Sequence, residues 1–265
     1  MLSLSDIVNV KVGIGRGVFE APGATVIGGK KPSFNLEILK LFANGEQGFW
    51  YDPSDMGTMY QDAAGTVPVT AVGQAVGLIR DKSGRNNHAY QTTSAARPIL
   101  RQNAITGAYY LEFDGVDDRL VTGSFPSMGL ATTIFTGARS YKAATSAVVA
   151  RGVGGYLYQT TGSVVVQSVN KPVSILTSGN AVITVKYEGS GTGVTLKANN
   201  LSRTESTTDR GFNNSNPLVI GAFSNGGEVP LQGHIYCLIG ISKLTTDAES
   251  IAIEKEIAKR LGVTL

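Results

Sequence analysis

Alternating apolar and polar residues mark the beginning of the chain. Val8, Val10, Val12 and Ile14 fall at every second position and therefore share one face of an extended strand. The glycine-rich sequence that follows offers no local partner, and an unpaired strand must find a sheet edge in its own chain or in a neighbouring subunit. We therefore interpret this segment as an assembly arm. Its apolar side chains are Leu4, Ile7, Val8, Val10, Val12 and Ile14.

Helical spacing of apolar residues predicts a short connecting helix after the arm. The helix would span residues 35–43, with Ser33 or Asn35 as its cap and Asn44-Gly45 as its stop. Its apolar side would consist of Leu36, Ile38, Leu39 and Phe42. We take residues 1–46 as arm and connector, and residues 47–265 as the main domain.

Short strands separated by turn residues are indicated through most of the main domain. The clearest hairpin covers residues 181–198, where apolar and polar residues alternate on both sides of a glycine-rich loop, as expected of an antiparallel ladder with one buried face. Its predicted interior residues are Ala181, Ile183, Val185, Tyr187, Val194, Leu196 and Ala198. Further strands are expected at 49–51, 111–113, 132–138, 147–150, 163–169, 217–222 and 234–241, the last with Ile235, Cys237, Ile239 and Ile241 on one face.

A capped helix is predicted at the C-terminal end. Thr246 and Glu249 have the spacing of a capping box, and Gly262 is placed to end the helix. Its apolar stripe would contain Ile251, Ile253, Ile257, Ala258 and Leu261. Because the preceding main domain reads as strands, we expect this helix to dock on the surface of a β-sandwich.

Composition agrees with this pattern and excludes several functions. The 33 glycines and the charged fraction of only 16% indicate many tight turns and few long surface helices. The net charge is +3 and the basic residues are scattered, so we expect no nucleic-acid partner. No segment reads as a signal peptide or a membrane-spanning helix, and we expect a soluble protein that does not insert into membranes.

The single cysteine, Cys237, cannot form an intramolecular disulfide and is expected to be a buried hydrophobic residue. One cysteine and two distant histidines, His88 and His234, do not suffice for a closed zinc site. A serine–histidine–acid triad is not indicated either, because no nucleophile elbow is present. Each histidine is expected to lie at the surface or to be hydrogen-bonded.

Several motifs of the main domain resemble the laminin-G-like, concanavalin A-like jelly-roll domains of many phage and bacterial proteins. They are residues 49–55 (FWYDPSD), 81–89 (DKSGRNNHA), 97–98 (RP), 111–118 (LEFDGVDD), 217–222 (PLVIGA) and 233–236 (GHIY), with the capped helix after them. Residues 61–69 are similar to the version in phage-encoded proteins, and residues 2–10 to the start of some phage tail-sheath-type proteins. The resemblance implies an all-β jelly-roll β-sandwich with an N-terminal extended arm and a C-terminal helix. Members of this group bind glycans, bind proteins or only build structure, so the fold does not decide the function.

Four neighbouring acids, Glu112, Asp114, Asp117 and Asp118, are the candidates for catalysis or metal binding. Alternation places Glu112 and Asp114 on one side of a strand, similar to the Glu-x-Asp-x-x-Glu pattern of some concanavalin-fold glycosidases. The third acid, Asp117, is one methylene shorter and the strand ends at Gly115, so we interpret the acids as a solvated turn and expect no enzyme. Calcium held by Asp114, Asp117 and Asp118 is the one possible cofactor, as in some laminin-G-like domains.

Two other patterns have a simple structural explanation. The glycines Gly13, Gly15 and Gly17 lack the following helix of a dinucleotide-binding site. The aromatic residues that would stack on sugars in a binding protein are more often packed in a core. They are Trp50, Tyr51, Tyr109, Tyr110, Tyr156 and Tyr158.

From these observations we predict a non-enzymatic structural protein of a bacteriophage virion: a decoration, tail or fibre component made in the host cytoplasm and anchored by its arm. Its partners would be other virion proteins, and we expect a homo-oligomer, specifically a trimer. The alternative is an adhesin module on the phage surface that binds a host glycan or receptor. The third hypothesis is a glycoside hydrolase that uses Glu112 and Asp114.

Overall fold

The computed structural model describes residues 34–265 except 152–155, 168–171, 190–192, 207–211 and 225. The chain divides into two units, Met1–Pro32 and Ser33–Leu265, and all described residues belong to the second. The arm with its six apolar side chains and the cap candidate Ser33 lie outside the described residues.

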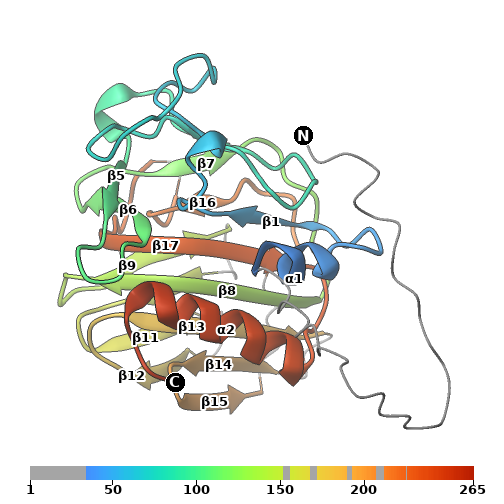
Figure 1. Ribbon diagram of the computed structural model, residues 1–265. Coiled ribbons are helices and arrows are strands. Elements are labelled where there is room, and N and C mark those ends of the chain that lie inside the picture. Colours follow the sequence, from blue (N-terminus) through green and yellow to red (C-terminus); the bar gives the residue numbers. More distant parts are fainter. Residues whose placement is uncertain (1–33, 152–155, 168–171, 190–192, 207–211, 225) are drawn as a thin grey trace, which may run out of the picture. The chain divides into compact units, whose positions relative to one another are not determined.

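Two antiparallel sheets form the body of this unit (Figure 1). The first sheet has the order β15 (Leu201–Glu205), β14 (Val194–Ala198), β13 (Ala181–Glu188), β8 (Ala131–Ser140), β17 (Gln232–Ile241), β6 (Tyr109–Asp114), β5 (Ile99–Gln102), and β1 (Gly48–Tyr51) also pairs with β17. The second has the order β12 (Val173–Leu176), β11 (Ser163–Gln167), β10 (Tyr156–Gln159), β9 (Ser146–Ala150), β16 (Val219–Ile220), β7 (Leu120–Thr122), β4 (Ala89–Tyr90), β3 (Leu78–Ile79), β2 (Met59–Tyr60). The predicted all-β sandwich is thereby confirmed.

The main core lies between the two sheets and follows the predicted alternation. In the hairpin β13–β14, Ile183, Val185 and Leu196 are buried in the core that also contains Leu120 and Val164 of the second sheet. Thr184, Lys186 and Lys197 of the same hairpin point to the outer face, where they meet Glu254 and Asp247 of the C-terminal helix. Period-two patterning therefore placed both faces of this hairpin correctly.

Two helices lie on the outer face of the first sheet (Figure 1): α1 (Phe34–Leu41) and α2 (Asp247–Leu261). Thr246 caps α2 with the predicted capping box, and Gly262 ends it in the left-handed conformation, with φ of 70°. A second core fills the space beneath the helices. Its larger members are Ile38, Phe42, Trp50, Phe135, Tyr236, Ile239, Ile241, Ile253, Ile257 and Leu261. The docking of the C-terminal helix on the sandwich is thus confirmed.

The apolar faces of both helices differ in detail from the prediction. Of the predicted apolar side of α1, Ile38 and Phe42 are buried, whereas Leu36 and Leu39 are 48% and 46% exposed. The helix turns Leu41 toward the sheet in their place. Ile251 of α2 is 44% exposed, since it lies one position outside the stripe that contacts the strands. Both helices are covered on one narrow stripe only, so an apolar residue beside it stays in solvent.

A β-bulge in β17 also changes the predicted face of that strand. Opposite β8 the register shifts between Ile235 and Cys237, so that Tyr236 is an extra residue. Ile235 therefore belongs to the core between the sheets, whereas Cys237 and Ile239 face the helices. A strict period of two cannot anticipate this, because a bulge reverses the side-chain direction beyond it.

The 81–89 motif is explained by a buried carboxylate that organises its own loop. Asp81 accepts hydrogen bonds from the backbone N–H groups of Trp50 (2.9 Å), Ser83 (2.8 Å) and Asn87 (3.0 Å), and from the Ser83 hydroxyl (2.8 Å). The Asn87 amide donates to the Gly48 carbonyl at 2.7 Å. The motif thus fastens the loop before β4 to the strand β1.

Among the described residues, no helix is long and apolar enough to span a membrane.

Candidate functional site

One row of side chains crosses four strands on the outer face of the first sheet. In the register of the sheet, Ile99 lies opposite Glu112, Glu112 opposite His234, and His234 opposite Arg139. The neighbouring residue Leu111 points into the core, because side chains alternate between the faces of a strand. The row therefore places polar and aromatic groups on the surface formed by β5, β6, β17 and β8.

Stacked rings give this surface its shape. The centroid of the His234 ring lies 4.0 Å from that of Tyr110 and 5.0 Å from that of Tyr141, and Tyr110 in turn lies 5.0 Å from Tyr236. Burial lowers the pKa of His234 to about 4, and the charge of Glu112 opposes this only in part. The imidazole is therefore neutral at neutral pH and acts as a packed ring rather than as a cation.

A pocket of about 360 Å³ opens beside the stack, which is a size typical of sites for small ligands. Glu112 forms one side and its Oε2 accepts a hydrogen bond from Arg101 Nε at 2.7 Å. Tyr141 is 44% exposed, and the Arg139 guanidinium lies 4.6 Å from the centre of its ring. We call this site the Glu112 pocket. Its lining residues are Ile99, Arg101, Glu112, Phe113, Asp114, Asp118, Tyr141, Gln232 and Gly233.

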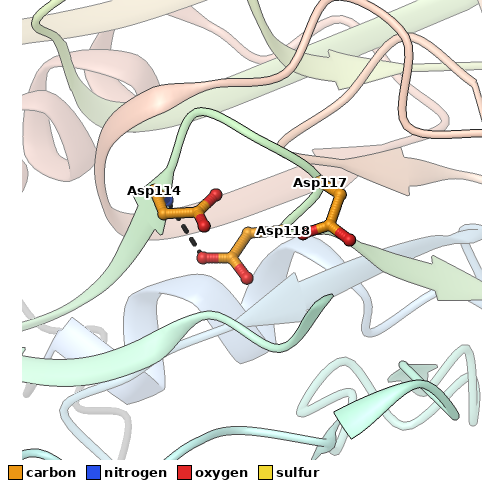
Figure 2. A group of neighbouring side chains, drawn as sticks. All are labelled: Asp114, Asp117 and Asp118. Atoms are coloured by element: carbon orange, nitrogen blue, oxygen red, sulfur yellow. Dashed lines mark hydrogen bonds between the residues drawn. The ribbon is translucent and has the colours of Figure 1, made fainter. Parts of the chain in front are cut away.

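The turn after β6 contributes the other acids of the pocket (Figure 2). Asp118 Oδ2 accepts a hydrogen bond from the backbone N–H of Asp114 at 3.0 Å, and Asp114 Oδ1 accepts one from Val116 at 2.8 Å. Gly115 has φ of 83°, the left-handed region that glycine adopts without strain. Two of the three acids in the 114–118 motif thus close the turn.

Charge is concentrated in this turn. The carboxylate oxygens of Asp114, Asp117 and Asp118 lie within 4.8 Å of one another. Burial, helped by the charges of Asp114 and Asp117 and opposed by the hydrogen bond from Asp114, raises the pKa of Asp118 to about 6. Asp118 therefore changes its charge just below neutral pH.

The acidic turn fits a calcium ion poorly. Ca²⁺ takes about six to eight oxygen ligands, and the three carboxylates would need backbone carbonyls beside them. The Gly115 carbonyl already accepts a hydrogen bond from Lys142 Nζ at 2.7 Å, and the Asp117 carbonyl accepts one from Arg119 Nη1 at 2.8 Å. Two cationic side chains thus already bind the carbonyl oxygens that a metal ion would need as further ligands. We assign no metal to the turn.

Glu112 and Asp114 share one face of β6, as the alternation predicts, and both line the Glu112 pocket. Asp117 is not one of the residues that line it. Hydrolysis by a pair of carboxyls requires one acid on each side of the scissile bond. Glu112 is bonded to Arg101, and Asp114 and Asp118 are each bonded to backbone N–H groups, so each carboxyl is tied to a fixed partner.

Of the aromatic residues singled out as sugar-stacking candidates, two are buried and three are half-buried among those the structure describes. Trp50 is 1% exposed beneath the Lys82 ammonium, and Tyr51 is 3% exposed in the core between the sheets. Tyr109, Tyr110 and Tyr158 are half-buried. The side chain of Tyr156 lies outside what the structure describes.

Tyr141, whose ring is exposed in the pocket, is not among the site residues predicted from the sequence. It follows Arg139 at a spacing of two, and this alternation was the available signal for a residue on the same face. Arg101 and Gln232 were also missed, because they join the pocket only through the pairing of β5 and β17 with β6.

The remaining residues considered for chemistry have structural roles. Cys237 is buried, and burial raises the pKa of its thiol to about 12, so it is unreactive. His88 is hydrogen-bonded as expected: its Nδ1 accepts from the backbone N–H of Asp81 at 3.0 Å.

Comparison with known proteins shows the fold. No family model matches the chain, and no curated protein matches it. An arabinofuranosidase solved with arabinofuranosyl-α-1,2-xylobiose aligns with a TM-score of 0.57 and 14% identity, over 84% of this chain and 65% of that chain. A variant of a GH54 α-L-arabinofuranosidase, soaked with 4-nitrophenyl α-L-arabinofuranoside, gives a TM-score of 0.56 at 14% identity, over 84% and 65%.

The binding domain of botulinum neurotoxin serotype D aligns with a TM-score of 0.52 and 14% identity, over 84% of this chain and 53% of that chain. This chain thus spans 65% or less of each of these solved chains. At such identities the likeness concerns the fold, and it places the chain among concanavalin-like β-sandwiches, as its motifs indicated.

Proposed function

We propose that the chain is a non-enzymatic glycan-binding module, and that the Glu112 pocket binds one sugar residue of the glycan. The observation that supports this most is the meeting of an exposed aromatic ring with charged hydrogen-bonding groups in one small hollow. Tyr141 offers its ring, Arg101 and Gln232 offer N–H donors, and the acids offer acceptors. Sugars present apolar C–H faces and a rim of hydroxyl groups, and such a pocket complements both.

Several polar atoms of the pocket are available for a ligand. Within the described part of the chain, Glu112 Oε1 and the terminal nitrogens of Arg101 have no hydrogen-bond partner, since the bond between the two residues uses Oε2 and Nε. The Gln232 side chain is exposed at the rim. Glu112 and Arg101 also hold each other in place, so a ligand would meet groups that are already oriented, and this reduces the entropic cost of binding.

The fold neighbours are consistent with this proposal. Two of them are arabinofuranosidases, one solved with a bound arabinofuranosyl-xylobiose, and a third is a toxin binding domain. A shared fold alone does not transfer their ligands, so the proposal depends on the pocket of this chain.

The absence of hydrolysis is part of the proposal. It is supported by the fixed hydrogen bonds of Glu112, Asp114 and Asp118, which keep these carboxyls from acting as a free nucleophile and acid. Incubation with the glycans that bind should therefore release no reducing sugar. Release that disappears in Glu112→Gln would make the chain a glycosidase instead.

Binding is tested by screening neutral oligosaccharides and then titrating the best ligand calorimetrically. Tyr141→Ala should weaken binding about two- to tenfold, because stacking on an exposed ring contributes about 0.5–1.5 kcal/mol. Tyr90→Ala is the matched control: Tyr90 is 39% exposed on the outer face of the other sheet, and its loss should leave neutral-glycan binding unchanged. Equal loss in both variants, or no neutral ligand at all, would overturn the proposal.

We further propose that the module is displayed on a bacteriophage particle, with the arm as its anchor and a trimer as its assembly. This rests on the phage-like motifs of residues 2–10 and 61–69. Mass spectrometry of purified particles should find the chain at a fixed copy number relative to the major capsid protein. Its absence from particles would remove the virion role and leave glycan binding untouched.

A further inference from the structure

A second hollow, of about 710 Å³, lies over β3 and β4 on the outer face of the second sheet, near the end of the sheet that β2 forms. Tyr90 lies opposite Leu78 in the sheet register, and Tyr90 is 39% exposed while Leu78 is buried at 8%. Their neighbours Ile79 and Ala89 point into the core. The hollow therefore has an aromatic ring and an apolar floor, and it faces away from the Glu112 pocket across the sandwich.

The hydrogen bond of His88 fixes which of its ring nitrogens carries the proton. Its Nδ1 accepts from the backbone N–H of Asp81, so in the neutral ring the proton sits on Nε2. Among the described residues, nothing bonds to this Nε2–H group, and the half-buried ring lines the hollow. His88 thus presents a donor to a ligand in the hollow.

Arg80 adds a positive charge at the same place. Its guanidinium lies 4.6 Å from the centre of the Tyr60 ring, and no carboxylate of the described residues pairs with it. Asp81 also lines the hollow, but it is 8% exposed and both of its carboxylate oxygens accept hydrogen bonds, Oδ1 from the backbone N–H of Ser83 and Oδ2 from the Ser83 hydroxyl. The hollow therefore offers donors and a cation, whereas the Glu112 pocket is rich in carboxylates.

We propose that this hollow is a second ligand site, which takes a carboxylate-bearing sugar such as a uronic acid residue. The ligand carboxylate would pair with the planar guanidinium of Arg80 and accept a hydrogen bond from His88 Nε2, and the sugar ring would lie on Tyr90. Arginine binds carboxylates through two parallel N–H groups, which gives both strength and orientation. Only the choice of a sugar as the carrier of the carboxylate rests on the proposed glycan-binding function.

The test is calorimetric titration with an oligogalacturonate and with its methyl-ester form, which has the same rings without the charge. The acid should bind at least tenfold more tightly than the ester, and more weakly as salt is added. Arg80→Gln should remove most of this preference. Arg80 is exposed, so the variant should keep the thermal midpoint of the wild type.

Tyr90→Ala should weaken binding of the acid about two- to tenfold. Tyr141→Ala should leave it unchanged, in reversal of the pattern expected for neutral glycans. Equal binding of acid and ester, or full binding by folded Arg80→Gln, would overturn the second site. Lack of neutral-glycan binding combined with intact acid binding would refute the Glu112 pocket and leave the second site standing.

Discussion

The pKa values of Asp118, which lines the Glu112 pocket, and of His234, in the aromatic stack beside it, shift in opposite directions. Burial disfavours the charged form of each, so the pKa of the acid rises to about 6 and that of the histidine falls to about 4. In the unfolded chain the two pKa values would be about 3.9 and 6.5. Acidification through this range therefore removes the destabilising negative charge of Asp118, but it favours a destabilising positive charge on His234. Variants of each residue separate the two effects on stability.

The first prediction concerns Asp118→Asn. The native state binds a proton at Asp118 before the unfolded state does, so ionisation of this group costs stability above about pH 6, and the cost vanishes as the pH falls toward 4. The amide oxygen can still accept the hydrogen bond from Asp114. We expect Asp118→Asn to be more stable than wild type by about 1 kcal/mol at pH 8, after allowance for solvent screening, and equally stable at pH 4. Urea unfolding at both pH values measures this, and a variant that is less stable at pH 8 would contradict it.

The second prediction concerns His234→Phe. Neutral His234 supports the fold above about pH 6.5, and this support is lost as the pH falls toward 4, because the unfolded state binds the proton first. Phenylalanine can fill the same stack between Tyr110 and Tyr141 without titrating. The variant should therefore lose less stability than wild type between pH 7 and pH 4.5 in the same unfolding assay. An unchanged pH dependence would show that the imidazole is not held neutral.

Arg151 supports the third prediction. It is 0% exposed, and its guanidinium donates to backbone carbonyls of two loops: to Phe125 and Pro126 at 2.8 Å each, to Phe212 at 2.7 Å, and also to Asn214. Arg151→Met leaves these carbonyls buried without donors and should cost about 3 kcal/mol or more in the free energy of unfolding. Arg203→Met is the control: Arg203 is exposed and paired with Glu205, so its loss should cost about 0.5 kcal/mol or less. Similar costs for the two variants would refute this role of Arg151.

At this scale the sequence predicted only part of the site. Period-two alternation correctly placed Glu112 and Asp114 on one face, because that depends on a single strand. The partners Arg101 and Tyr141 come from other strands, and their approach depends on the register between strands, which no local pattern reveals. No sequence pattern shows that Asp118 accepts a hydrogen bond in the turn and does not bind a metal. This follows from Lys142 and Arg119, which donate hydrogen bonds to the neighbouring Gly115 and Asp117 carbonyls.

Among the elements, α2 was predicted almost completely, since its capping box and terminal glycine are local signals. Its exact rotation was not, and Ile251 is exposed as a result. The bulge in β17 could not be predicted from local sequence either, because it arises in the pairing of β17 with β8. Short-range sequence patterns thus determine the type and length of these elements. Packing against the rest of the fold determines which of their side chains are buried.

The contact between α2 and the first sheet leads to the fourth prediction. Gly137 of β8 lies directly beneath the helix: a Cβ atom there would come within 2.4 Å of Leu261 Cδ1 and 2.7 Å of Ile257 Cγ2. Gly137→Ala should therefore destabilise the fold by about 1–3 kcal/mol through overpacking. In combination with Leu261→Ala the cost should be less than the sum of the two single costs by at least about 0.5 kcal/mol, because the cavity receives the methyl group. Strict additivity in the double-mutant cycle would contradict this close approach.

Among the hollows of the described residues, two of opposite character lie on the two outer faces of the sandwich. The Glu112 pocket combines three acids with one arginine, and the second hollow combines Arg80 with the donor of His88. The first lies over β5, β6 and β17 of the first sheet and the second over β3 and β4 of the second sheet, and the core of the sandwich lies between the two sheets. One module would in this way engage two kinds of sugar at once, which raises avidity toward a mixed polysaccharide without any new contact.

NMR titration of the isotope-labelled full chain tests most directly whether the Glu112 pocket binds a neutral sugar. Addition of the best neutral glycan should shift the resonances of Tyr141, Arg101 and Gln232 with one common dissociation constant, and leave Tyr90 and Arg80 unshifted. Shifts confined to other surfaces, or the absence of saturable shifts with every neutral glycan, would contradict the account.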